Sequence, residues 1–172
     1  MEGMQLQNIK AFTDTNLIEM APITVFVGQN SCGKSSIIRM PVVISQTFES
    51  DQSVELCLHD ARSDFDYGNF SDVVHGHNGD SFSIAFFYNL AMYMRNGIYI
   101  EATSDLEKEK RRRYEGKPPI CCKAKLVLTF GLYNHSSYVS LIKCDLFLDE
   151  GSFCSYEKSR DKKYYDNPFI FN

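Results

Sequence analysis

Hydrophobic and polar residues alternate along most of this chain after residue 53, a pattern that predicts a protein built largely of β-strands. The connections between the alternating stretches are rich in Asn, Asp, Gly and Ser, which favour turns. Asn96-Gly97 and residues 149–152 are typical of tight hairpins, so we expect the strands to form an antiparallel meander. The predicted strands are Val54–Leu58, Ser81–Tyr88, Ala91–Arg95, Ile98–Glu101, Cys121–Phe130, Tyr138–Leu148 and Phe153–Tyr156.

The first 50 residues show a different pattern. Met4–Ile9 alternates apolar and polar residues and predicts a half-buried strand, and Leu17–Met20 predicts a second, shorter strand. Lys10–Asn16 is a polar connection between them. Ile23–Val27 is a run of β-branched and aromatic residues, which predicts a third strand that is buried.

A helix is predicted to follow from Lys34 to about Ser45–Phe48. It carries apolar residues on nearly every side, so we expect it to be buried. Pro41 lies well inside it. An interior proline removes one backbone hydrogen bond and costs about 3 kcal/mol, so we expect a kink near Ile37–Met40.

The sequence between the third strand and the helix matches G-x-x-x-x-G-K-[ST], the Walker A motif. Its glycines allow a tight turn, and the free N–H groups of the loop and of the first helical turn attract anions. Lys34 is expected to contact β- and γ-phosphate oxygens, and the Ser35 hydroxyl to ligate Mg²⁺. A chance lysine in a glycine-rich turn is the alternative, which the order of strand, loop and helix disfavours. The predicted nucleotide-binding residues are Gly28, Gln29, Asn30, Ser31, Cys32, Gly33, Lys34, Ser35 and Ser36.

Length, charge and cysteine content limit the remaining possibilities. The chain has 172 residues, the length of one domain, and a formal net charge of −4, which gives no general attraction to nucleic acid or anionic membranes. No stretch has the length of a transmembrane helix, and the N-terminus lacks a signal-peptide pattern. The six cysteines form no C-x-x-C pair, and one lies in the phosphate loop. We therefore expect a cytoplasmic protein with no membrane partner.

The N-terminal segments together resemble the opening of the ABC/SMC-type ATPases of the AAA family, which include RecF, the SMC heads, and the OLD-like and related prokaryotic defence ATPases. The resemblance covers residues 4–48 and rests on Leu6–Phe12, Leu17 and Ala21–Ser36. Asp66–His75 is also similar to a stretch that follows the first helix in one branch of that group.

The resemblance implies an α/β P-loop NTPase fold in which ATP and Mg²⁺ bind the first lobe of a two-lobe head. One helix would pack on a largely antiparallel sheet in a single domain, 1–172. Residues 1–50 would form the hairpin, phosphate loop and helix, and 51–172 a meander with a charged loop at about 104–119. Lys10 matches a basic position that lies near the nucleotide in such heads. Gln46 matches a metal-linked glutamine, although its place at the helix end favours ordinary surface polarity.

The residues that would complete hydrolysis in such a head are not evident. The chain contains no L-S-G-G signature. Leu146–Glu150 matches the Walker B pattern, in which Asp149 would order Mg²⁺ and Glu150 would activate water. A hairpin turn before Gly151-Ser152 explains both acidic residues without a catalytic role, and we favour this interpretation. We therefore expect an N-terminal lobe that ends abruptly, is inactive alone, and needs a C-terminal lobe or a second head in a dimer or higher oligomer.

Three functional hypotheses remain. The first is an ATP-binding lobe of an ABC/SMC/OLD-like ATPase, switched by nucleotide and acting in DNA metabolism or phage defence with nucleic acid or an effector protein. The second is an assembly module that binds ATP without hydrolysing it. The third is a P-loop kinase or GTPase, which the antiparallel meander disfavours because those folds repeat βαβ units.

Other candidates for chemistry have simpler explanations. His75 and His77, with Asp72 or Asp80, are candidate metal ligands, but histidines in a Gly/Asn loop are more often solvated. Cys121 and Cys122 alternate on a strand and are better explained by packing. The mixed-charge run Lys108–Arg113, with Lys117, is a candidate contact for nucleic acid, and a solvated insertion is the favoured interpretation.

Overall fold

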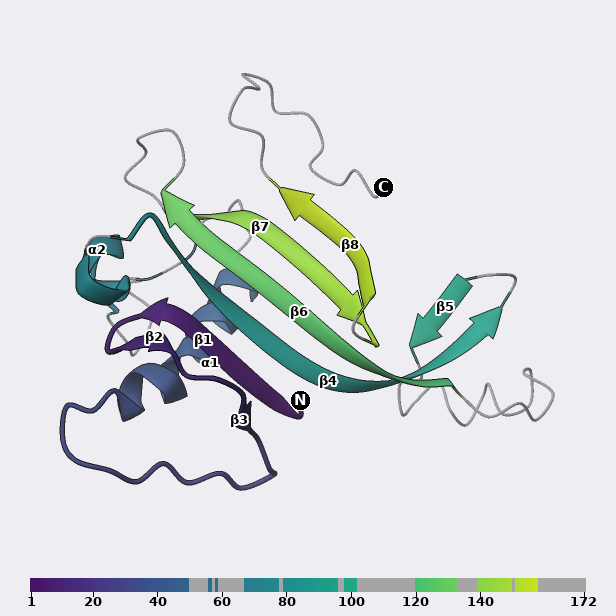
Figure 1. The fold of residues 1–172 in the computed structure, drawn as a ribbon, viewed down its shortest axis with the longest axis horizontal. Coiled ribbons are helices and arrows are strands. Elements are labelled where there is room, and N and C mark those ends of the chain that lie inside the picture. The colour runs from purple at the N-terminus through teal and green to yellow at the C-terminus, as the bar shows by residue number, and fades with distance from the viewer. Residues whose placement is uncertain are drawn as a thin grey trace, which may run out of the picture.

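The computed structural model describes residues 1–49, 56, 58, 67–77, 79–95, 98–101, 120–132, 139–149 and 151–157. Over these residues the chain is an α/β structure with one largely antiparallel sheet and few helices (Figure 1). The predicted α/β class and antiparallel meander are therefore confirmed at this level.

The sheet contains eight of the described strands, in the order β2-β1-β4-β6-β7-β8, with β3 also pairing with β1 and β5 with β4. Every neighbouring pair is antiparallel. The strands are β1 (Gly3–Ile9), β2 (Phe12–Asp14), β3 (Ile18–Glu19), β4 (Ser81–Arg95), β5 (Ile98–Glu101), β6 (Ile120–Leu132), β7 (Val139–Leu148) and β8 (Gly151–Glu157).

Three helical segments accompany the sheet in the described part of the chain. The long helix α1 (Lys34–Glu49) lies on one face of the sheet, behind β1 in the view of Figure 1. The short helix α2 (Phe70–Val73) and the 3₁₀ turn η1 (His75–His77) lie before β4. The N–H of Lys10 donates to the Val73 carbonyl at 2.6 Å, which ties this short segment to the end of β1.

The core forms between α1 and one face of the sheet. Side chains at alternate positions of β1, β4 and β6 face α1, because successive residues of a strand point to opposite sides. Phe82 of β4 stacks on Phe130 of β6 with ring centroids 5.6 Å apart. The main core residues are Met4, Leu6 and Ile9 of β1, Ile37, Met40, Val43 and Ile44 of α1, Phe82, Ile84 and Phe86 of β4, and Leu128 and Phe130 of β6. The face of α1 with Ile38 and Val42 is exposed, so the prediction of a helix buried all round is wrong.

Most predicted strands agree with the structure. The hairpin around Asn96-Gly97 is confirmed by the pairing of Arg95 with Ile98, and the final hairpin by the pairing of Leu148 with Gly151. Lys10–Asn16, predicted as a polar connection, contains β2, because Ile9 pairs with Phe12 across a tight turn.

Some predictions fall on residues outside the described ranges. They are Asn96-Gly97 themselves, most of Val54–Leu58, the charged loop at about 104–119 with its basic cluster, and Glu150. The helix continues through Pro41 to Glu49, and the kink near Ile37–Met40 stays a prediction.

Ile23–Val27 departs from its prediction as a buried strand. Ile23, Val25 and Val27 are 85%, 75% and 87% exposed, and the segment is not a strand; only Phe26 packs against the core. A strand exists only where a neighbour accepts and donates its backbone hydrogen bonds. Among the described residues no strand pairs with this segment, since β1 already lies between β4 on one side and β2 and β3 on the other.

Candidate functional site

The glycine-rich loop, residues 28–33, connects the exposed segment Ile23–Val27 to the first turn of α1. Gly33 has a φ of +94°, and a Cβ at this position would lie 2.5 Å from Cε2 of Phe12. Only glycine combines this backbone angle with such a close approach. Ser31, at the loop tip, also has a positive φ of 64°. The predicted nucleotide-binding residues are accessible: Gly28, Gln29, Asn30, Ser31, Cys32 and Ser35 are exposed, and Gly33, Lys34 and Ser36 are partly exposed.

The Lys34 side chain folds back over this loop. Its ammonium donates to the carbonyls of Gly28 at 2.8 Å and Gln29 at 2.5 Å, and lies 3.6 Å from the Cys32 sulfur. These contacts are all local, so the lysine closes the loop on itself and takes no part in the hydrophobic core.

A cavity of about 300 Å³ lies between the glycine-rich loop and the segment of α2 and η1; we call it the loop cavity. It brings together Lys10 with Ser31 and Gly33 of the glycine-rich loop, which the sequence separates from Lys10 by more than 20 positions. Its lining residues are Lys10, Ala11, Ser31, Gly33, Ser36, Asp72, Val74, Gly76 and His77. The position that the family resemblance assigned to Lys10 is therefore next to the glycine-rich loop.

Tyr67 joins the two sides of the loop cavity, and the sequence analysis did not single it out. Its hydroxyl donates to the Ser36 carbonyl at 2.6 Å, and its own carbonyl accepts from the Lys10 ammonium at 3.0 Å. The Lys10 ammonium also lies 5.0 Å from the centre of the Tyr67 ring. The only sequence signal for Tyr67 is its place in the stretch Asp66–His75 that carries the weaker resemblance.

The two histidines of η1 are each held by a backbone carbonyl. Nδ1 of His75 lies 2.8 Å from the Lys10 carbonyl, and Nδ1 of His77 lies 2.6 Å from the Ser71 carbonyl. Because a carbonyl only accepts, Nδ1 is the protonated nitrogen in both rings. Asp72, a candidate ligand with them, accepts from the Asn69 N–H at 2.9 Å and caps α2. In the described ranges no three His, Cys, Asp or Glu side chains are grouped to hold a metal.

Unusual backbone angles are concentrated around the loop cavity. Lys10, Ser31 and His77 have positive φ values of 52°, 64° and 60°. Each such residue costs on the order of 1 kcal/mol or more and persists only where surrounding contacts impose it. Such strain is typical of functional sites, and here three of the lining residues carry it.

Asp149 lies at the opposite end of the sheet from the glycine-rich loop. Its carboxylate accepts from the Lys123 N–H at 2.9 Å, and its own N–H donates to the Lys123 carbonyl at 2.8 Å, which ties the β7–β8 turn to β6. The strand register places this turn level with the start of β1. Gly33 contacts Phe12, which lies just after the other end of β1. The two ends of β1 are roughly 20 Å apart at about 3.3 Å per residue. The structure therefore does not bring Asp149 to the loop, and the turn interpretation fits its contacts.

Three further residues that the sequence singled out are Gln46, Cys121 and Cys122. Gln46 is 12 positions after Lys34 on α1, about 18 Å along the helix axis, so it does not share a metal with Ser35. Cys121 is exposed and Cys122 buried, as expected for packing on alternate faces of β6.

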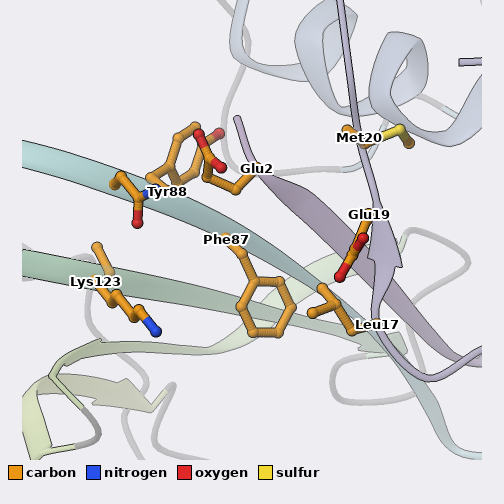
Figure 2. Close-up of a pocket in the computed structure, with 9 residues that line it drawn as sticks. Glu2, Leu17, Glu19, Met20, Phe87, Tyr88 and Lys123 are labelled. Carbon is orange, nitrogen blue, oxygen red and sulfur yellow. The ribbon is translucent and has the colours of Figure 1, made fainter.

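A second cavity, of about 470 Å³, lies where β1 begins, next to β3 and the middle of β4 (Figure 2). It contains two carboxylates, of Glu2 and Glu19, one ammonium, of Lys123, and the ring of Phe87. It lies at the Asp149 end of the sheet, and none of the residues predicted from the phosphate-loop motif lines it.

Comparison of this chain with protein-family models, with curated protein sequences and with solved structures finds no match. None of the helices in the described ranges has both the length and the apolar character needed to cross a membrane. The assignment of the site therefore depends on the motif and on the geometry of the loop cavity.

Gly33→Ala should destabilise the protein more than Gly76→Ala. Both glycines have positive φ, but a Cβ at Gly33 collides with Phe12, whereas a Cβ at Gly76 meets nothing within 4 Å. We expect about 1 kcal/mol for Gly76→Ala, from backbone strain alone, and a clearly larger loss for Gly33→Ala. Urea unfolding of both variants measures this, and equal losses would contradict the close contact.

The stability of the protein should fall between about pH 10 and pH 12 because of Tyr67. Burial raises the pKa of Tyr67 to about 12 from its ordinary value of 10. In this interval the unfolded chain releases the proton and the folded chain keeps it, so the free energy of unfolding falls by up to about 1.4 kcal/mol per pH unit. Tyr67→Phe should lack this decrease in urea unfolding at about pH 9 to 11. A pH-independent difference between the two proteins would contradict the prediction.

Proposed function

We propose that the glycine-rich loop binds the triphosphate of ATP with Mg²⁺, and that this chain is the ATP-binding lobe of an ABC/SMC/OLD-like ATPase head. The main support is the Walker A match from Gly28 to Ser35, placed directly before the 16-residue helix α1. The loop cavity adds a second cation, Lys10, beside the same loop.

The contacts of Lys34 support phosphate binding. Its ammonium now donates to two neutral carbonyls, of Gly28 and Gln29. Charged phosphate oxygens form stronger hydrogen bonds with an ammonium than neutral carbonyls do, so a bound triphosphate would take Lys34 from the loop carbonyls. The first turn of α1 contains no acidic residue that would compete for its free N–H groups. Ser35 is exposed on that turn, where its hydroxyl can reach a Mg²⁺ ion on the phosphates.

The exposed segment Ile23–Val27 supports the proposal that this chain binds a partner. Three apolar side chains alternate with Thr24 and Phe26 in an extended stretch that no described strand pairs with. Ile38 and Val42 of α1 are exposed as well. Large apolar surface of this kind is typical of an interface. We propose that a strand from a C-terminal lobe or a second head covers it in a dimer or higher assembly.

The biological setting is proposed on the resemblance of residues 4–48 alone. In that proposal the lobe switches with nucleotide in the cytoplasm and acts in DNA metabolism or phage defence, with nucleic acid or an effector protein as partner. Function follows from sites and not from a fold class, so this step is an analogy.

A second candidate function is an assembly module that binds ATP without hydrolysing it. It is favoured by the position of Asp149, which stabilises the β7–β8 turn at the other end of the sheet. Within the described part of the chain, the loop cavity contains one carboxylate, that of Asp72, which caps α2. A kinase or GTPase is disfavoured, because the described strands after α1 are all antiparallel.

Lys34→Ala should abolish binding of ATP with Mg²⁺ while the protein stays folded, because in the described part of the chain the Lys34 ammonium forms its hydrogen bonds with loop atoms. Isothermal titration calorimetry measures the affinity, and urea unfolding measures the fold. Lys143→Ala is the matched control, since Lys143 lies on β7 and pairs with Asp145 at 3.0 Å. ATP binding by Lys34→Ala with wild-type affinity would refute the proposed site.

The purified chain should show negligible ATP turnover on its own, because among the described residues no Walker B carboxylate lies next to the loop. Phosphate release under saturating ATP and Mg²⁺ measures this. Robust turnover that is lost in Glu150→Gln would show that the acids of the β7–β8 turn act as a Walker B pair, and would reject the assembly module.

A further inference from the structure

Tyr67 connects Lys10, which lines the loop cavity, to Ser36 in the first turn of α1 on the other side of it. Its hydroxyl is bound to the Ser36 carbonyl in the first turn of α1, at 2.6 Å. Its carbonyl and ring hold the Lys10 ammonium, at 3.0 Å and 5.0 Å. One side chain thereby contacts both the helix that follows the phosphate loop and the lysine that faces it.

Tyr67 is itself firmly placed. It is 4% exposed and belongs to the hydrophobic core. Its N–H donates to the Leu58 carbonyl at 2.9 Å, and the next residue, Gly68, has a φ of +85° with Asp72 where a Cβ would be. The position of its ring is therefore set by the fold and not by the ligand.

The backbone of Lys10 is also held by hydrogen bonds, so the position of the Lys10 ammonium depends on the conformation of the side chain alone. The Lys10 N–H donates to the Val73 carbonyl at 2.6 Å, and the Lys10 carbonyl accepts from His75. A lysine side chain has four rotatable bonds, and fixing them costs conformational entropy. The attraction between the Lys10 ammonium and the Tyr67 ring offsets part of that cost.

We propose that Tyr67 is a positioning residue of the nucleotide site: anchored on Ser36, it sets the Lys10 ammonium beside the glycine-rich loop to receive an ATP phosphate. This inference rests on the proposed function, because it takes ATP as the ligand of the loop. The Lys10 ammonium then approaches the polyphosphate from the loop cavity, and the Lys34 ammonium approaches it from the glycine-rich loop. An ammonium that is already held in place binds a phosphate more tightly than a mobile one, because the conformational entropy of the lysine side chain is lost before the ligand binds.

A double-mutant cycle between Tyr67 and Lys10 tests the proposal. Tyr67→Phe removes the anchor on Ser36, Tyr67→Leu also removes the ring, and Lys10→Met removes the charge but keeps the aliphatic chain. The affinity for ATP with Mg²⁺ is measured by calorimetry for each single variant and each double variant. Urea unfolding reports the stability of every protein, because Tyr67 is buried and Tyr67→Leu loses packing.

Lys10→Met should weaken ATP binding about tenfold, as expected for one charge-assisted hydrogen bond. Tyr67→Phe should weaken it about threefold and Tyr67→Leu about tenfold, since a misplaced lysine loses most of its contribution. In the Lys10→Met background both Tyr67 variants should change the affinity by less than about 1.5-fold. This loss of effect is the signature of positioning, because a merely structural role for Tyr67 would cost the same in both backgrounds.

Tyr88→Phe is the matched control, since it makes the same chemical change in the second cavity and should leave ATP affinity unchanged. Equal costs of the Tyr67 variants with and without Lys10, or no cost in either background, would overturn the positioning role while leaving the ATP site intact. Failure of the wild-type protein to bind ATP would instead overturn the proposed function, and this inference with it.

Discussion

The pairing of β1 with β4 is the constraint on which the rest of this structure depends. It aligns Gly3 with Phe87 and Gln7 with Ser83, and so joins the first 50 residues to the strands that begin at Ser81. Met4, Leu6 and Ile9 are fully buried in this arrangement, between α1 and the sheet. Because β1 ends at Ile9, its pairing also fixes Lys10 at the edge of the sheet, where the glycine-rich loop lies.

The loop cavity shows how local and distant contacts combine at one site. Lys34 and the glycine-rich loop form a local unit, closed by hydrogen bonds within seven residues. Lys10, Tyr67 and His77 reach the same place from other parts of the chain, through hydrogen bonds to backbone carbonyls. Backbone carbonyls are fixed by secondary structure, so contacts of this kind place side chains accurately at a site. The Lys10 ammonium in the loop cavity thus stands on a rigid frame in a chain whose net charge is −4.

The exposed segment Ile23–Val27 differs from the loop cavity, because no described strand pairs with it. Its side chains have the composition of a buried strand, yet 75–87% of the surface of Ile23, Val25 and Val27 is exposed. Burying three such side chains would contribute on the order of 5 kcal/mol, which is comparable to the stability of a small domain. A partner that adds a strand here would therefore gain apolar contacts and backbone hydrogen bonds directly next to the proposed phosphate site.

The sequence alone determined the elements whose signals are local. Period-two alternation predicted β4, β6 and β7, the Asn-Gly pair predicted the β4–β5 hairpin, and the Walker A spacing predicted the loop before α1, because each depends on residues close along the chain. Only the tertiary structure decided which residues surround that loop. Tyr67 carries no signal of its own, His77 was considered only as a metal ligand but lines the loop cavity, Asp149 matched a motif but lies in a distant turn, and Ile23–Val27 has strand composition without a strand beside it. Burial, pairing and proximity are properties of the neighbours that a residue meets in space, and these are fixed only when β1, β4 and α1 pack together.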